Sequence, residues 1–137
     1  MAILQHPGEV GADLITRSSR VAFADNTLAV IRDAVATNLE YIGASDWVAR
    51  IAADVPGRFE TLVKQLAVAP IPTNPDKLAI YCTSVVSDII DRDLLRRKKD
   101  VLGALQRLDS ASEPERYRAL QQESVTIELE RRSLRAE

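Results

Sequence analysis

The sequence predicts an all-α protein in which a small helical bundle is followed by a long helix and a C-terminal antiparallel helical hairpin. Aromatic residues make up only 4% of the 137 residues, while alanine, leucine, valine and arginine recur throughout. This composition favours helix over sheet. Apolar residues recur at helical spacing in the segments bounded by proline or glycine, and no segment alternates as a strand does.

The first residues read as the end of a helix. Ile3 and Leu4 enter an apolar run with no capping residue ahead of them, whereas natural helices usually begin at Ser, Thr, Asp or Asn. We therefore expect the chain to be an excised piece of a longer protein. Pro7-Gly8 breaks this first segment, and a short helix is expected over about residues 9–16.

Three further helices are expected before residue 70. Asp25 or Asn26 is suited to cap the first, which Gly43 closes, and Ser45 is suited to cap the second. The third follows Pro56 and ends at a run of three prolines. Each has an apolar stripe wide enough to face a globular core; the inward candidates are Leu28, Ile31, Val35, Leu39, Trp47, Val48, Ile51, Ala52, Phe59, Leu62, Val63 and Leu66.

One long helix is expected from Pro75 to Leu108, a stretch with no further proline and a single glycine. At the rise of an α-helix it would span roughly 50 Å, which is more than a small bundle needs. Its first half is apolar enough to complete the bundle, so its second half must extend beyond it. We therefore expect a bundle subdomain over residues 1–92 and a hairpin subdomain over residues 93–137.

The segment "DSASEP" marks the turn of the hairpin. Ser112 and Glu115 have the spacing of a capping box, so a final helix is expected over about residues 113–135. Two apolar rows would then meet in a seam between the two arms. The seam residues are Leu94, Val101, Leu105 and Leu108 on the outgoing arm and Tyr117, Leu120, Ile127 and Leu134 on the return arm.

The residues offer little for catalysis. His6 is the one histidine and Cys82 the one cysteine, too few for a zinc site, which needs about four N or S ligands. There is no phosphate-binding loop, dinucleotide-binding glycine motif or HExxH motif. We expect this chain by itself to be no enzyme, to have no catalytic or metal-binding residue and to carry no cofactor.

The basic run Arg96 to Lys99 invites a nucleic-acid interpretation. The formal net charge is −2, however, and four consecutive helical residues cover most of a helix circumference without forming a stripe. Asp93 and Asp100 flank the run, and no aromatic platform is near it. A solvated helix surface is favoured and direct nucleic acid binding is expected to be weak or absent, although a nucleic-acid-binding module using residues 96–99 stays an alternative. No apolar run is long enough to span a membrane, and a cytoplasmic location is expected.

Four apolar residues of the hairpin fall outside the expected seam. They are Leu95 and Leu102 on a flank of the outgoing arm and Val125 and Leu129 on the far face of the return arm. Two helices alone cannot bury all their faces, so such residues suggest a partner. Two alternatives stay open: the hairpin folds back and buries them against the bundle, or two copies of the chain pair in a self-associating structural protein.

Several segments together resemble the C-terminal domain of bacterial DNA primase, most closely of the actinobacterial type. They are "LQHP", "VIRDAV", "LAVAPIP", "DLLRRKKDVLGALQRLDS" and "ERYRALQQESVTIELERRSLR", and their order and spacing cover essentially the whole chain. The resemblance implies a helical bundle followed by a helical hairpin. It also implies a full-length parent that is a DNA-directed RNA polymerase with zinc-binding and polymerase domains elsewhere.

The resemblance further implies a role in replication. In this family the domain docks onto the N-terminal domains of the hexameric replicative helicase, largely through the hairpin, and in some members it also contacts the tail of single-stranded DNA-binding protein. No catalytic residue carries over. Position within the hairpin and helical face geometry together indicate a set of helicase-contacting residues: Leu95, Lys99, Leu102, Val125, Leu129, Arg131 and Arg132.

Overall fold

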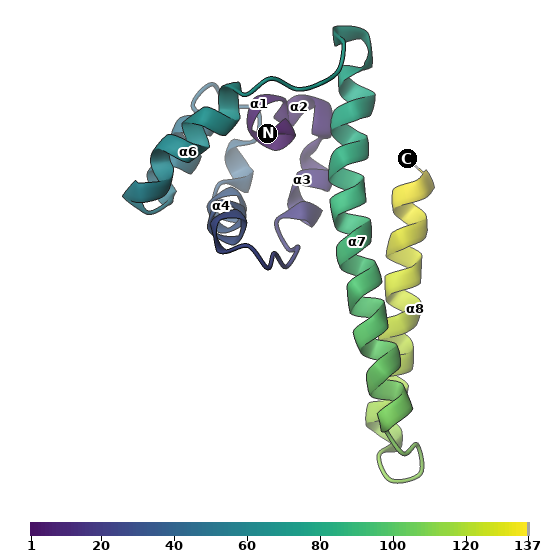
Figure 1. Cartoon of the computed structure of the whole chain (residues 1–137). Coiled ribbons are helices and arrows are strands. Elements are labelled where there is room, and N and C mark those ends of the chain that lie inside the picture. Colours follow the sequence, from purple (N-terminus) through teal and green to yellow (C-terminus); the bar gives the residue numbers. More distant parts are fainter. Residues whose placement is uncertain (137) are drawn as a thin grey trace. The chain divides into compact units, whose positions relative to one another are not determined.

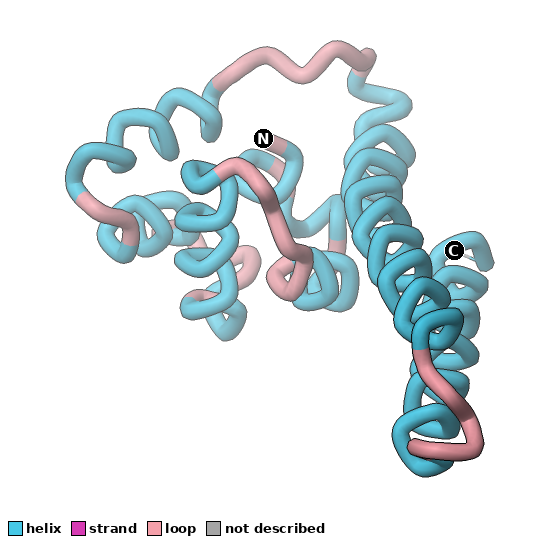
Figure 2. The backbone as a smooth tube through the Cα atoms, turned by 60° about the horizontal axis from the view of Figure 1, so that its bottom comes forward, coloured by secondary structure: helices cyan, strands magenta, loops and turns pink. Residues whose placement is uncertain are grey.

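A computed structural model describes residues 1–136 of the chain and the side chains of residues 1–135. The predicted all-α class is confirmed, because this part of the chain contains α-helices and short 3-10 turns and no strand (Figure 2). Contacts divide the chain into two compact units, Met1–Ile90 and the residues from Asp91 onward. The sequence placed this boundary after residue 92.

The first unit begins with three short helices: α1 (Ala2–Gln5), α2 (Pro7–Val10) and α3 (Ala12–Ser18). The single helix expected over residues 9–16 is therefore wrong. Proline starts α2, since a first helical position needs no N–H donor. Gly11 has a φ of 89°, which a helix cannot contain, so it separates α2 from α3.

Two side chains fasten α1 to the rest of this unit. The amide of Gln5 donates to the carbonyls of Leu66 and Ala69 at 2.8 and 2.6 Å, which satisfies backbone acceptors at the end of a later helix. The indole nitrogen of Trp47 donates to the carbonyl of Ile3 at 3.0 Å. The first turn is thus held by contacts more than forty residues away in the sequence.

The helices that follow are α4 (Asn26–Thr37), a 3-10 turn (Leu39–Tyr41), α5 (Trp47–Asp54) and α6 (Gly57–Val68). Asp25 caps α4 as expected, accepting from the backbone N–H of Leu28 at 3.1 Å. The predicted Ser45 cap is wrong, because α5 begins at Trp47 and Asp46 precedes it. The carboxylate of Asp46 pairs instead with Arg50 at 2.7 Å.

The end of α4 also differs from the expectation that Gly43 closes it. The helix ends at Thr37, where the Asn38 amide donates to the carbonyl of Ala34 and to the Asp54 carboxylate at 2.8 and 2.7 Å. Asn38 is buried, so these bonds offset the cost of removing its amide from water. Gly43, with a φ of 84°, turns the chain after the 3-10 segment.

The core of the first unit lies between the packed helices α1, α4, α5 and α6 and the first turns of α7. Ile15, Ile51, Val63 and Cys82 are fully buried, and burying one such aliphatic side chain stabilises the fold by about 1.5–3 kcal/mol. Ile51 and Val63 belong to the apolar stripes that the sequence predicts, whereas Leu28, also expected to face the core, is exposed. The remaining buried apolar residues of this unit are Ala2, Leu4, Val10, Leu14, Val21, Ile31, Ala34, Val35, Trp47, Ala52, Val55, Val86 and Ile90.

The long helix α7 runs unbroken over Leu78–Arg107, a length of 30 residues or about 45 Å. A 3-10 turn (Pro75–Lys77) precedes it, and the Asn74 side chain caps that turn by accepting from the N–H of Lys77. Helix α8 (Pro114–Ala136) then returns alongside the second part of α7 as an antiparallel neighbour (Figure 1). The predicted long helix and hairpin are both present.

The turn between α7 and α8 is organised by Asp109. Its carboxylate accepts from the N–H of Ala111 at 2.9 Å and from the hydroxyl of Ser112 at 2.8 Å, and these bonds lower the pKa of Asp109. The predicted capping box is therefore wrong. Since α8 begins at Pro114, Ser112 lies too early to cap it, and its hydroxyl donates to Asp109.

Candidate protein-interaction surface

Four of the eight residues that the sequence proposes as the hairpin seam are buried. Leu94 and Val101 of α7 and Ile127 and Leu134 of α8 are buried, with Ile127 fully so. The other seam candidates, nearer the turn, are partly exposed: Leu105, Leu108, Tyr117 and Leu120. Burial is therefore greatest in the part of the hairpin far from the turn and decreases toward the turn, where two helices have no further layer to cover their side chains.

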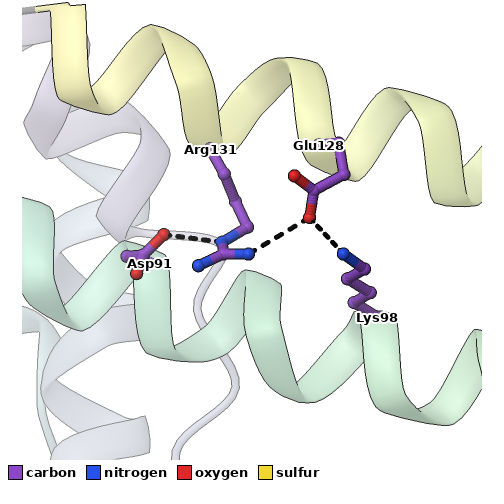
Figure 3. Close-up of polar contacts among 4 residues, drawn as sticks. All are labelled: Asp91, Lys98, Glu128 and Arg131. Atoms are coloured by element: carbon purple, nitrogen blue, oxygen red, sulfur yellow. Dashed lines mark hydrogen bonds and ion pairs between the residues drawn. The ribbon is translucent and has the colours of Figure 1, made fainter.

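A chain of ion pairs joins α8 to α7 beside this seam (Figure 3). The guanidinium of Arg131 bonds the Asp91 carboxylate at 2.9 Å and the Glu128 carboxylate at 3.1 Å, and Glu128 also accepts from the Lys98 ammonium at 2.6 Å. The hydrogen bond from Lys98, followed by that from Arg131, lowers the pKa of Glu128. Hydrogen bonds to Asp91 and Glu128 raise the pKa of Arg131.

This network corrects the place given to Arg131. Its sequence position suggested a charge at the rim of a partner contact, but only 14% of its side chain is exposed and both of its carboxylate partners belong to the hairpin itself. Arg131 thus braces the two arms. Sequence reasoning missed the network because its cross-helix pairs join residues 30 and 40 positions apart, and only the register of the hairpin brings them together.

Two of the four cations of the basic run are engaged in ion pairs within the hairpin. Arg96 pairs with Asp93 at 2.7 Å and with Asp100 at 3.7 Å, and the bond to Asp93 is the main reason that the pKa of Arg96 is raised. Lys98 pairs with Glu128. Lys99 is exposed to solvent. Two of the four cations are therefore neutralised by neighbouring carboxylates, which weakens the run as a phosphate-binding site.

The four apolar residues outside the seam are all exposed. The exposed fractions are 37% for Leu95, 42% for Leu102, 52% for Val125 and 57% for Leu129. We name these four residues the hairpin apolar face. Sequence reasoning found them because each departs from the seam spacing by one or two positions.

Helical spacing relates this face to the ion pairs. Leu95 lies four residues after Asp91 and three before Lys98, and Leu102 lies four after Lys98. Residues three or four apart share one side of a helix, so both leucines lie on the side of α7 that carries the bridge to α8. By the same rule Val125, three residues before Glu128, lies on the side of α8 that carries the other half of the bridge. The apolar face therefore borders the ion pairs through Leu95, Leu102 and Val125, whereas Leu129, which directly follows Glu128, is turned about 100° away from it.

The first unit offers weaker candidates. An apolar cavity of about 190 Å³ opens among Ile3, Phe23, Leu28 and Leu66, with Arg32 at its edge. The Arg32 guanidinium is already bonded to the carbonyl of Val21 at 2.7 Å and to Asp33 at 2.9 Å. Because these bonds already engage the Arg32 guanidinium, this arginine is not available to bind a charged ligand in the cavity.

Nothing in the described residues indicates metal or thiol chemistry. His6 lies between α1 and α2, and no group of three His, Cys, Asp or Glu side chains within residues 1–136 is arranged to hold a metal ion. Cys82 is buried, and this burial, followed by repulsion from Glu9, raises the pKa of its thiol, which disfavours the reactive thiolate. None of the described helices is both long enough and apolar enough to cross a bilayer.

Comparison with known proteins places this arrangement among known folds. No protein-family model matches the sequence, and no curated protein matches it. Among solved structures, the helicase-binding domain of primase from Mycobacterium tuberculosis superposes with a TM-score of 0.74 at 24% sequence identity. The match covers 97% of this chain and 84% of that one. The two chains share one fold. The structural likeness confirms, at the level of the fold, the resemblance first noted from the sequence.

Proposed function

We propose that this chain is a noncatalytic interaction domain of a DNA primase, which docks onto the N-terminal domain of the hexameric replicative helicase. Docking would keep RNA primer synthesis beside the advancing fork. One observation carries the proposal: nearly the whole chain has the fold of a mycobacterial domain described as binding helicase. The primase activity itself would belong to other parts of the parent protein.

The hairpin apolar face is the proposed contact. Its four side chains are exposed on a unit with few buried apolar residues of its own, and burying each against a partner removes apolar surface from water. The helicase would supply a helical surface that packs on α7 and α8. Lys99 and Arg132, both exposed, lie within one turn of the face and would act as charges at its rim.

The test is binding of the helicase N-terminal domain to the unmodified chain and to the double variant Val125→Asp/Leu129→Asp. Each lost contact costs about 2 kcal/mol at a binding hot spot, and each 1.4 kcal/mol is a factor of ten, so we expect the two changes together to lower affinity by nearly 1,000-fold. Both positions are exposed on α8, so helical circular dichroism should be retained.

A matched control is available in the first unit. Val68 and Ile80 are 81% and 72% exposed, so Val68→Asp/Ile80→Asp makes the same chemical change on the other unit. It should leave binding unchanged. Equal loss in both variants would show that the contact is not specific to the hairpin, and full binding by the α8 variant would remove Val125 and Leu129 from it.

The same preparations address the remaining alternatives. A titration with single-stranded DNA at low salt tests the basic run as a nucleic-acid site, and solution mass over a range of concentrations tests self-association. The tail of single-stranded DNA-binding protein is a further proposed partner, supported by the resemblance alone. A synthetic peptide of that tail, added to the unmodified chain, tests it directly.

A further inference from the structure

The outward side of α8 carries a strip of six residues that contains no acid. Its members follow one another at helical spacing, and all six are exposed. Two are apolar, two are arginines and two are glutamines. We name it the α8 strip: Arg118, Gln121, Gln122, Val125, Leu129 and Arg132.

No acidic residue in this part of α8 is paired with an arginine of the strip in the described residues. Between Arg118 and Arg132 the acids are Glu123, Glu128 and Glu130. Glu128 is occupied by Lys98 and Arg131. Glu123 and Glu130 lie four residues before and three residues after the fully buried Ile127, so they belong to the side of the helix that faces α7. Glu128 lies near Arg132 but is engaged by two cations, and Glu115 lies three residues before Arg118, so the acids of α8 offset the charge of the strip only in part.

The two arginines of the strip have no ion-pair partner among the residues that the structure describes, unlike Arg96, Arg116 and Arg131. The chain as a whole has a formal charge of −2. A locally positive strip on a mildly acidic protein attracts a negative partner at short range, because interactions between exposed charges beyond about 8 Å are largely screened at physiological salt.

We propose that the α8 strip binds an acidic amphipathic helix of a protein partner. This inference rests on the proposed function and assigns a chemistry to the helicase surface that docks there. The partner helix would present two apolar side chains to Val125 and Leu129. One carboxylate of the partner would lie opposite Arg132, within one helical turn of the two apolar side chains. A second would lie opposite Arg118, two turns from them in the other direction along the helix.

Nucleic acid fits the same strip less well. Arg118 and Arg132 are separated by about 21 Å along the helix, and the space between them is occupied by amides and apolar groups. Base recognition on a single strand relies on aromatic stacking, but the strip has no aromatic residue, and Tyr117 is a partly buried residue of the seam. Carboxylates beside apolar side chains complement this order of groups better than a continuous row of phosphates does.

The experiment measures association kinetics of the helicase N-terminal domain with Arg118→Glu/Arg132→Glu. Reversing both charges should lower the association rate about tenfold at low salt and flatten its salt dependence, with a smaller change in dissociation rate. The control Arg20→Glu/Arg92→Glu makes the same change in net charge at two exposed arginines outside α8. Its association rate should stay within about twofold of the unmodified chain.

A second probe does not depend on the helicase. It is a designed helical peptide with two leucines four residues apart, to pack on Val125 and Leu129, and two glutamates placed opposite Arg132 and Arg118. The control peptide carries lysines in place of the two glutamates. The glutamate peptide should bind at least about tenfold more tightly and perturb the backbone amides of residues 118–132 in nuclear magnetic resonance spectra.

The outcomes separate the two proposals. If the helicase domain binds the strip variant and the control equally, the inference is overturned while the proposed function stands. If the unmodified chain fails to bind the helicase domain, the proposed function is overturned, and the peptide comparison alone decides the inference. Equal binding of the glutamate and lysine peptides would overturn the inference. So would a result in which Arg118→Glu/Arg132→Glu loses affinity for single-stranded DNA alone.

Discussion

Ile51 and Ile127 are both fully buried, yet they lie in different surroundings. Ile51 belongs to α5, which contacts α1, α4 and α6 within the first unit. Ile127 belongs to α8, whose one neighbour within the second unit is α7. In the described residues the first unit buries seventeen apolar side chains and the second buries four, namely Leu94, Val101, Ile127 and Leu134.

The polar contacts differ in the same way. In the first unit Gln5, Trp47 and Asn38 use their side chains to satisfy backbone carbonyls inside a packed globule. In the second unit Arg131 and Lys98 join two helices by ion pairs at their edge. The comparison teaches that a globule with several layers is stabilised mainly by its core, whereas a two-helix unit leaves its outer faces exposed and available to a partner.

The largest expected stability effect is that of Ile51→Ala. The surrounding helices restrain collapse around the cavity, so unfolding free energy should fall by about 4 kcal/mol. Urea denaturation followed by fluorescence measures it, because Trp47 is the one tryptophan and lies in this unit. Leu102→Ala serves as the exposed control and should change stability by less than about 0.5 kcal/mol.

Ile127→Ala makes the same change in the hairpin. Two helices can move together more readily than a packed bundle, so a smaller loss of about 2 kcal/mol is expected. Circular dichroism, which reports all helices, should shift more than Trp47 fluorescence does. Equal losses at Ile51 and Ile127 would mean that the seam is as rigid as the bundle core and would break the comparison.

The smallest expected effect is a dependence on acid that comes from Glu128. Its pKa is lowered in the folded protein from an ordinary value of 4.5, so its contribution is present above that value and is lost as the pH falls through the lowered folded pKa. Glu128→Gln should reduce this part of the acid sensitivity of helicity. The matched change Glu60→Gln, in an exposed pair with Lys64 of the first unit, should leave the acid profile unaltered.

Much of the fold follows from local patterns. The stripes that contain Ile31, Ile51 and Val63, the breaks at proline, the Asp25 cap and the long final helices all depend on neighbours within a few residues, which the sequence displays. The errors lie where two local signals compete. Gly11 divides a segment that reads as one helix, Asp46 replaces Ser45 before α5, and Asp109 engages the hydroxyl expected to cap α8.

The candidate interaction surface also has a part that local sequence predicts and a part that it does not. Leu95, Leu102, Val125 and Leu129 could be selected from spacing, because a residue that departs from an apolar seam must lie on another side of its helix. The position of Arg131 between the two arms could not be predicted from spacing, because its partner Asp91 is 40 residues away and their pairing depends on the register of the hairpin.

The sequence by itself determined the helical class, the order of the helices and the presence of apolar residues beyond the seam, because helical periodicity is a local property. Only the tertiary structure decided which charges are paired inside the hairpin and which remain exposed on α8. The physical reason is that an ion pair across two helices depends on distances that no stretch of contiguous sequence contains.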